Sequence, residues 1–68
     1  MFKITLKAAR VNANYSQKEA AEKLNVSNKT LCSWESGLTL PSAEKIDMIC
    51  NLYGIPYDYI NFLPNNSL

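Results

Sequence analysis

Histidine is absent from this chain of 68 residues, and there are only two cysteines. A structural zinc site needs four cysteine or histidine donors, so the composition leaves no ligand set for one. Histidine is also the most common general base in enzymes. Neither a glycine-rich phosphate loop nor a pair of neighbouring catalytic carboxylates stands in its place. The sequence therefore predicts no metal site, no cofactor and no enzymatic activity.

Long hydrophobic runs are absent as well, which argues against a membrane-spanning helix. The first residues, MFKITLKAARV, lack the apolar stretch and the cleavage site of a signal peptide. Hydrophobic residues make up 47% of the chain, an ordinary fraction for a folded domain. We expect one small cytoplasmic domain over residues 1–63, followed by a flexible tail or the start of a linker over residues 64–68.

Positive charge is scarce, since the net charge is only +1. The charges are nevertheless unevenly distributed along the chain. Residues 1–40 carry six lysines and arginines against three glutamates, a net charge of +3, whereas residues 41–68 carry one lysine against three acidic residues, a net charge of −2. The asymmetry weakly favours a polyanionic partner for the first half of the chain.

The most informative segment is SQKEAAEKLNVSNKTLCSWESG, residues 16–37. Ser16 and Glu19 have the spacing of a capping box, Ser27 is placed to cap a second helix, and Gly37 is placed to end it. The pattern predicts one helix over residues 17–24 and another from 28 to about 35 or 36.

Small or apolar residues recur in this segment where two steeply crossed helices would touch. They are Ala20, Ala21, Leu24, Val26, Leu31 and Trp34. The residues between them in the second helix are polar and have no such packing role. Two helices that hold a short polar helix outward form a helix-turn-helix, here over residues 16–36, whose second helix enters the major groove of DNA.

Three further helices complete an all-α fold, which we predict as a compact five-helix bundle. The first begins at residue 4 or 5, ends near Asn12 and carries an apolar stripe with Phe2 at its start. The fourth lies between a capping Ser42 and Gly54. The fifth opens at Pro56 and runs to about residue 62.

Together these residues resemble the Cro/C1-type (XRE family) helix-turn-helix domain of phage repressors and bacterial regulators. The resemblance covers about residues 2–60 and is carried by Arg10, Ser16, Gln17, Ala20, Ala21, Leu24, Val26, Ser27, Leu31, Trp34, Glu35, Ser36, Gly37, Pro41, Ser42, Leu52 and Gly54. It implies a lambda repressor-like fold and a homodimer on double-stranded operator DNA, in a bacterium or a phage-infected host cell.

The resemblance also implies roles for individual positions. Base edges would be contacted by Asn28, Lys29, Cys32 and Ser33, and phosphates by Gln17, Ser27, Ser36 and Thr39. The chemistry of these groups agrees with such roles. An asparagine amide pairs with adenine, lysine donates to guanine, and a small thiol suits the methyl group of thymine. Helix N-termini present free N–H groups to phosphate.

Two other sets of residues take structural roles under the same resemblance. Arg10 and Glu35 would form an ion pair that orients the second helix of the motif. Leu38 and Leu40 stand where the family often carries lysine or arginine. They either fold back onto the fourth helix or form an exposed apolar patch with Ile55, Tyr57 and Tyr59, and we favour the patch as a dimer interface.

The predicted function is sequence-specific DNA binding by a transcriptional regulator, a phage-type repressor acting as a dimer on a palindromic operator. Two alternatives remain open. The chain can be the DNA-binding module of a larger repressor, an antitoxin or a restriction-modification controller. It can also be a helix-turn-helix that binds a protein partner and has no operator of its own.

Overall fold

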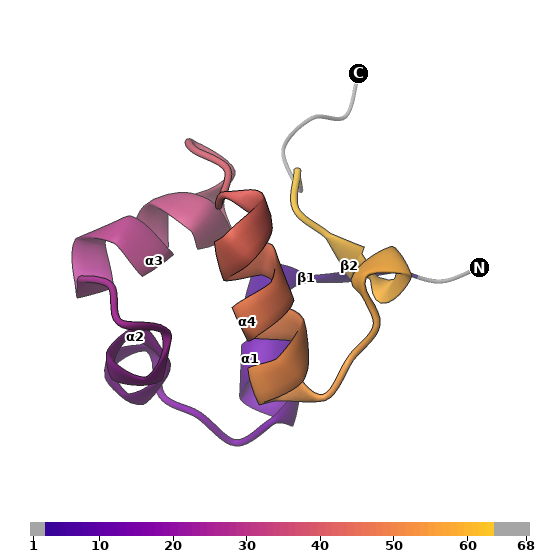
Figure 1. The fold of residues 1–68 in the computed structure, drawn as a ribbon, viewed down its shortest axis with the longest axis horizontal. Coiled ribbons are helices and arrows are strands. Elements are labelled where there is room, and N and C mark those ends of the chain that lie inside the picture. Colours follow the sequence, from indigo (N-terminus) through magenta and orange to yellow (C-terminus); the bar gives the residue numbers. More distant parts are fainter. Residues whose placement is uncertain (1–2, 64–68) are drawn as a thin grey trace.

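The computed structural model describes residues 3–63, which form four α-helices, one turn of 3₁₀ helix and two short strands. The elements, in chain order, are β1 (Ile4–Thr5), α1 (Leu6–Asn12), α2 (Gln17–Leu24), α3 (Asn28–Ser36), α4 (Ala43–Tyr53), η1 (Tyr57–Tyr59) and β2 (Ile60–Asn61). Figure 1 shows α2 end-on below α3, with α4 crossing in front of α1. Phe2 and the predicted tail at residues 64–68 lie outside the described residues.

The prediction of a fifth helix from Pro56 to residue 62 is wrong. The chain makes a single 3₁₀ turn, closed by the Tyr59 N–H donating to the Pro56 carbonyl at 3.0 Å, and then extends as β2. β2 pairs in parallel with β1, with Ile60 beside Ile4. The segment is too short to hold a helix on its own and is rich in aromatic and β-branched residues, which favour a strand where a partner strand is available.

The first helix also begins later than predicted, at Leu6. Thr5 is its N-cap, and the Thr5 hydroxyl accepts a hydrogen bond from the Ala8 N–H at 3.0 Å. Ile4 and Thr5 are extended because they pair with β2. The two ends of the described chain are therefore joined by backbone pairing, and the architecture is four helices with a small parallel sheet.

Caps mark the ends of α2 and α3. Ser16 and Glu19 form a complete capping box, and these hydrogen bonds lower the pKa of the Glu19 carboxyl below its ordinary value. Ser27 caps α3 by accepting from the Thr30 N–H at 3.0 Å. Asn25 ends α2 in the left-handed conformation, with φ of 61°.

Each α-helix contributes one large, fully buried side chain to the core. These are Leu6 in α1, Leu24 in α2, Leu31 in α3 and Ile49 in α4. Ile60 of β2 and Phe62, which follows this strand, belong to the same core, so the strand pair is packed against the helices. Among residues 3–63, no helix is long and apolar enough to cross a membrane.

Candidate nucleic-acid interface

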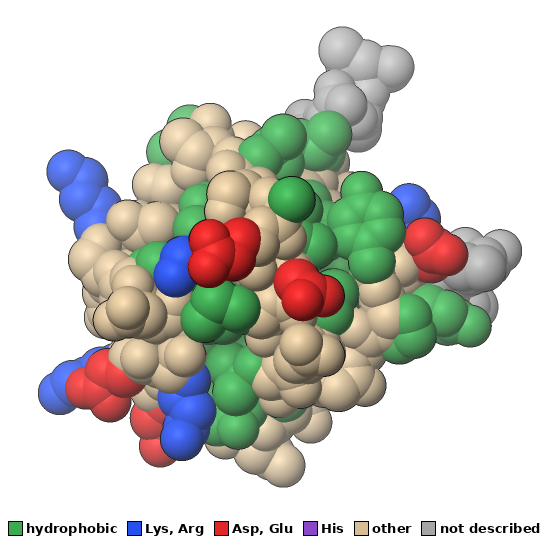
Figure 2. Space-filling view, viewed as in Figure 1, with side chains coloured by type: hydrophobic (Ala, Val, Ile, Leu, Met, Phe, Trp, Pro, Cys, Tyr) green, Lys and Arg blue, Asp and Glu red, His purple; other side chains and the backbone are tan. Residues whose placement is uncertain are grey.

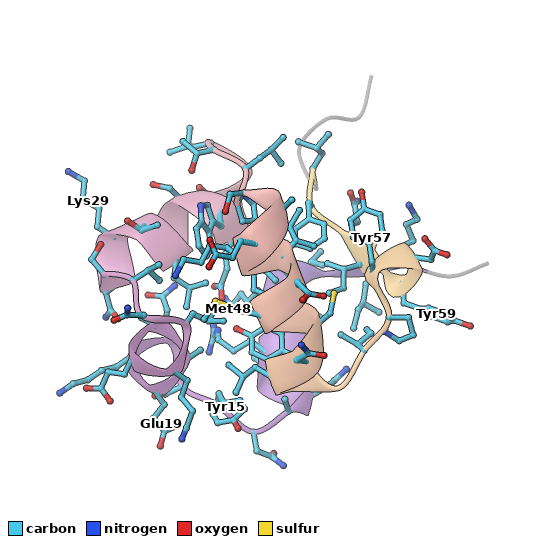
Figure 3. The ribbon with its side chains drawn as sticks, viewed as in Figure 1. Tyr15, Glu19, Lys29, Met48, Tyr57 and Tyr59 are labelled. Atoms are coloured by element: carbon cyan, nitrogen blue, oxygen red, sulfur yellow. The ribbon has the colours of Figure 1, made fainter. Side chains whose placement is uncertain are left out.

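The outer face of α3 is formed by side chains that point away from the core. Leu31 and Trp34 are buried beneath it, with exposed fractions of 0% and 6%. Of the four residues predicted to contact bases, Asn28, Lys29 and Cys32 are exposed, whereas Ser33 is half-buried. Figure 3 shows Lys29 extending away from the body of the protein at the start of α3. The helix thus has an apolar inner face and a polar outer face.

A buried ion pair holds the other end of α3. Arg10 Nε lies 2.7 Å from Glu35 Oε2, and Arg10 Nη2 donates to Glu35 Oε1 at 3.3 Å. The side chains are only 9% and 6% exposed. This hydrogen-bonded carboxylate raises the pKa of the Arg10 guanidinium, so the charge is kept inside the fold.

The same ion pair fixes the start of α2. Arg10 Nη1 donates to the Tyr15 carbonyl at 2.9 Å, and Gln17 Nε2 donates to Glu35 Oε1 at 3.2 Å. The family resemblance predicts a phosphate contact for Gln17 and gives no indication of this hydrogen bond between Gln17 and Glu35. One network therefore connects α1, the beginning of α2 and the end of α3.

A shallow hollow of about 550 Å³ lies over this network. Its lining brings together three predicted DNA contacts, Gln17, Cys32 and Ser36, from two helices. Lys7 of α1 lies in the same lining and was not predicted. The sequence does contain a signal for this position: Lys7 lies three residues before Arg10, and residues three apart share a face of a helix.

Comparison with known proteins now decides the family. The model of the helix-turn-helix family matches residues 6–60, which run from the start of α1 to the first residue of β2. The chain belongs to the XRE family of helix-turn-helix proteins. This is a family of DNA-binding transcription regulators.

One curated relative of this XRE-family domain is the HTH-type transcriptional regulator ImmR of Bacillus subtilis (strain 168). The two are 44% identical over 55 residues, which are 81% of this chain and 43% of ImmR. The chain therefore spans less than half the length of that relative. No solved structure matches the chain significantly.

The remaining predicted site residues of this XRE-family domain lie beyond α3. Thr39 is exposed, and so are Leu38 and Leu40, at 79% and 57%. Figure 2 shows hydrophobic side chains along the upper edge of that view, over the α3–α4 loop and the described residues that follow β2. Both leucines thus expose most of their surface, although Leu40 also lines a groove with Ile46 of α4.

The other three members of the predicted apolar patch are spread around η1. Tyr57 and Tyr59 are 58% and 45% exposed, whereas Ile55 is half-buried. Leu40 and Tyr57 line one groove of about 240 Å³, together with Pro41, Ile46 and Phe62 among others. Figure 3 shows Tyr59 pointing away from the molecule. The structure thus brings Leu40 and Tyr57 together but places Tyr59 apart from this groove.

The buried hydroxyl group of Tyr53 leads to a prediction about the stability of this XRE-family domain. Its hydroxyl is buried without a hydrogen-bond partner among residues 3–63, and burial raises its pKa to about 12. Tyr53→Phe removes this unpaired polar atom without leaving a large cavity. We expect the free energy of unfolding to rise by about 1 kcal/mol in a urea titration. Tyr53→Ala is the control and is expected to lose about 3 kcal/mol. A clear loss in Tyr53→Phe would contradict the prediction.

Proposed function

We propose that this chain binds double-stranded DNA in a sequence-specific manner, as a phage-type repressor that acts as a homodimer on a palindromic operator. The observation that carries the proposal is the outer face of α3, which is polar, exposed and held in place by the buried pair of Arg10 and Glu35. Membership of a family of DNA-binding regulators and the likeness to a transcriptional regulator support it.

In this proposal, base readout is performed by the outer face of α3. Asn28 pairs with an adenine, Lys29 donates to guanine O6 and N7, and Cys32 contacts the methyl group of a thymine. Ser33 completes the set from its half-buried position. A half-site that contains A and G at its outer end is the expected preference.

Phosphate contacts flank that face and set the register on the duplex. Gln17 lies at the start of α2 and Ser27 at the start of α3, where free N–H groups favour an anion. Ser36 and Thr39 approach the backbone from the end of α3 and the following loop. Because positive charge is scarce, we expect modest affinity and a shallow dependence on salt.

The experiment that tests this function is binding selection from a random duplex pool, followed by titration of the selected DNA at two salt concentrations. An enriched inverted repeat with half-sites about 34 Å apart would support a dimer with one α3 in each of two successive major grooves. Binding that is weak, blind to sequence and lost at moderate salt would contradict the proposal.

The dimer surface leads to a separate prediction for Leu40, which is 57% exposed beside the groove that Tyr57 also lines. A carboxylate at this position would be desolvated in an apolar interface, so Leu40→Asp is expected to weaken self-association by at least about tenfold. Sedimentation velocity over a range of concentrations measures this. Lys18→Asp, on the exposed surface of α2, is the matched control. A wild-type monomer at all concentrations would argue against the homodimer.

A second candidate function follows from the length of the relative. Because this chain corresponds to 43% of ImmR, it can serve as the DNA-binding module of a larger regulator. In that case the isolated domain binds a half-site weakly, and the dimer forms only when the remaining part of the protein is present. The selection experiment separates the two, since a module alone enriches a single half-site and not an inverted repeat.

A further inference from the structure

Lys45 is an unusual residue for its position in α4. It is the third residue of the helix, after the N-cap Ser42, and its N–H donates to the Ser42 hydroxyl at 3.3 Å. The N-terminal turn of a helix carries partial positive charge and favours acidic side chains, such as the preceding Glu44. A lysine there is locally unfavourable, so its place in the fold needs another explanation.

The explanation lies at the end of α2. The half-buried Lys45 side chain crosses to that helix, and its Nζ donates to the Leu24 carbonyl at 2.9 Å. Leu24 is the last residue of α2, where carbonyl groups have no partner within the helix. The Asn25 N–H closes the end of α2 by bonding to the Ala21 and Glu22 carbonyls, and Lys45 Nζ is the donor that reaches the Leu24 carbonyl. The ammonium also faces the negative end of the helix dipole.

This hydrogen bond acts on the turn that positions the recognition helix. Only Asn25, Val26 and Ser27 separate Leu24 from the first residue of α3. Val26 is already tied back by its N–H to the Ala21 carbonyl at 2.9 Å. Movement of the Leu24 carbonyl would therefore be passed to Asn28 and Lys29 over a very short length of backbone. α2 and α4 are also in contact with each other, so Lys45 joins two helices that are already neighbours.

We propose that Lys45 is a positioning residue for base readout: by holding the end of α2 to α4, it sets the placement of the first turn of α3 on the DNA. The inference rests on the proposed DNA-binding function and adds to it a residue that touches no base. Lys45 is not a phosphate contact in this proposal, because its Nζ donates a hydrogen bond to a backbone carbonyl inside the domain.

The test compares three variants with the wild-type chain. Lys45→Met removes the charge and the hydrogen bond, and Lys45→Arg restores a donor. Lys23→Met is the matched control. It removes an exposed cation from the last turn of α2, the turn that Lys45 reaches from α4. Each is titrated with the selected duplex and with an unrelated duplex, at several salt concentrations and well below its unfolding temperature. Amide chemical shifts of residues 25–29 are recorded without DNA.

For Lys45→Met, we expect the ratio of specific to non-specific affinity to fall about tenfold, while the salt dependence of binding stays unchanged. The amide shifts of residues 25–29 should change as well. Lys45→Arg is expected to recover most of the ratio, and Lys23→Met to keep all of it. The combination identifies positioning, because the loss of a phosphate contact would weaken binding to both duplexes and reduce the salt slope by about one.

Two results would overturn the inference while the proposed function stands. One is a selective wild-type protein whose Lys45→Met variant keeps its specificity ratio. The other is a loss of affinity that is equal for both duplexes and accompanied by a lower salt slope. If the wild-type chain itself shows no preference for any duplex, the proposed function fails first, and the role of Lys45 in readout fails with it.

Discussion

Glu35→Gln is expected to lower the free energy of unfolding by about 3 kcal/mol, a large part of the stability of so small a domain. The change keeps the shape of the side chain but leaves the Arg10 guanidinium buried without its counter-charge. It also weakens the acceptor that holds Gln17 at the start of α2. Thermal or urea unfolding followed by circular dichroism measures the loss.

The control is a double-mutant cycle with Arg10→Met. The Glu35 substitution in this cycle is Glu35→Leu. Each single substitution, Arg10→Met or Glu35→Leu, leaves one buried polar partner unpaired, whereas the double variant removes both charges together. The double variant is therefore expected to lose less than the sum of the single losses. Strict additivity, or a Glu35→Gln variant as stable as the wild type, would mean that the pair contributes nothing to the fold.

Asn28→Ala and Lys29→Ala together are expected to abolish operator recognition. Each side chain is exposed at the start of α3, and a good contact with a base edge contributes about 1–3 kcal/mol of discrimination. Removal of both should lower the affinity for the selected duplex by two to three orders of magnitude, whereas binding to unrelated DNA changes far less. Titration of both duplexes by fluorescence anisotropy measures the two effects.

Lys18→Ala serves as the control for Lys29→Ala, since it removes an exposed lysine from α2 that has no predicted contact with bases. The two lysine variants should differ in their effect on base preference. Loss of Lys29 should relax the preference at one base pair of the half-site, while loss of Lys18 leaves every preference intact. If the Asn28 and Lys29 variants bind the selected duplex as tightly as wild type, α3 does not read this DNA.

The helices that could be predicted from the sequence are those whose limits depend on residues three or four positions apart. The box of Ser16 and Glu19, the cap at Ser27 and the glycine at 37 act within one helical turn, so local spacing was sufficient. The outward face of α3 follows in the same way from helical periodicity, which leaves Leu31 and Trp34 inside.

The features that escaped prediction depend on residues distant in sequence. Whether residues 57–62 form a helix or a strand is decided by Ile4, which offers β2 a partner at the other end of the domain. The contacts of Gln17 with Glu35 and of Lys45 with Leu24 likewise arise only after three helices have packed. Sequence patterns contain no information on such pairs without a three-dimensional arrangement.

The strand pair of β1 and β2 also bears on how the domain folds. Ile4 pairs with Ile60 and Thr5 with Asn61, so formation of the sheet requires closure of nearly the whole domain as one loop. Contacts within α2 and α3 are local and form quickly, whereas long-range pairing requires a loss of chain entropy before any favourable contact has formed. We therefore expect the helix-turn-helix to assemble early and the strands to join last. The slow step of folding would then be the joining of the two chain ends.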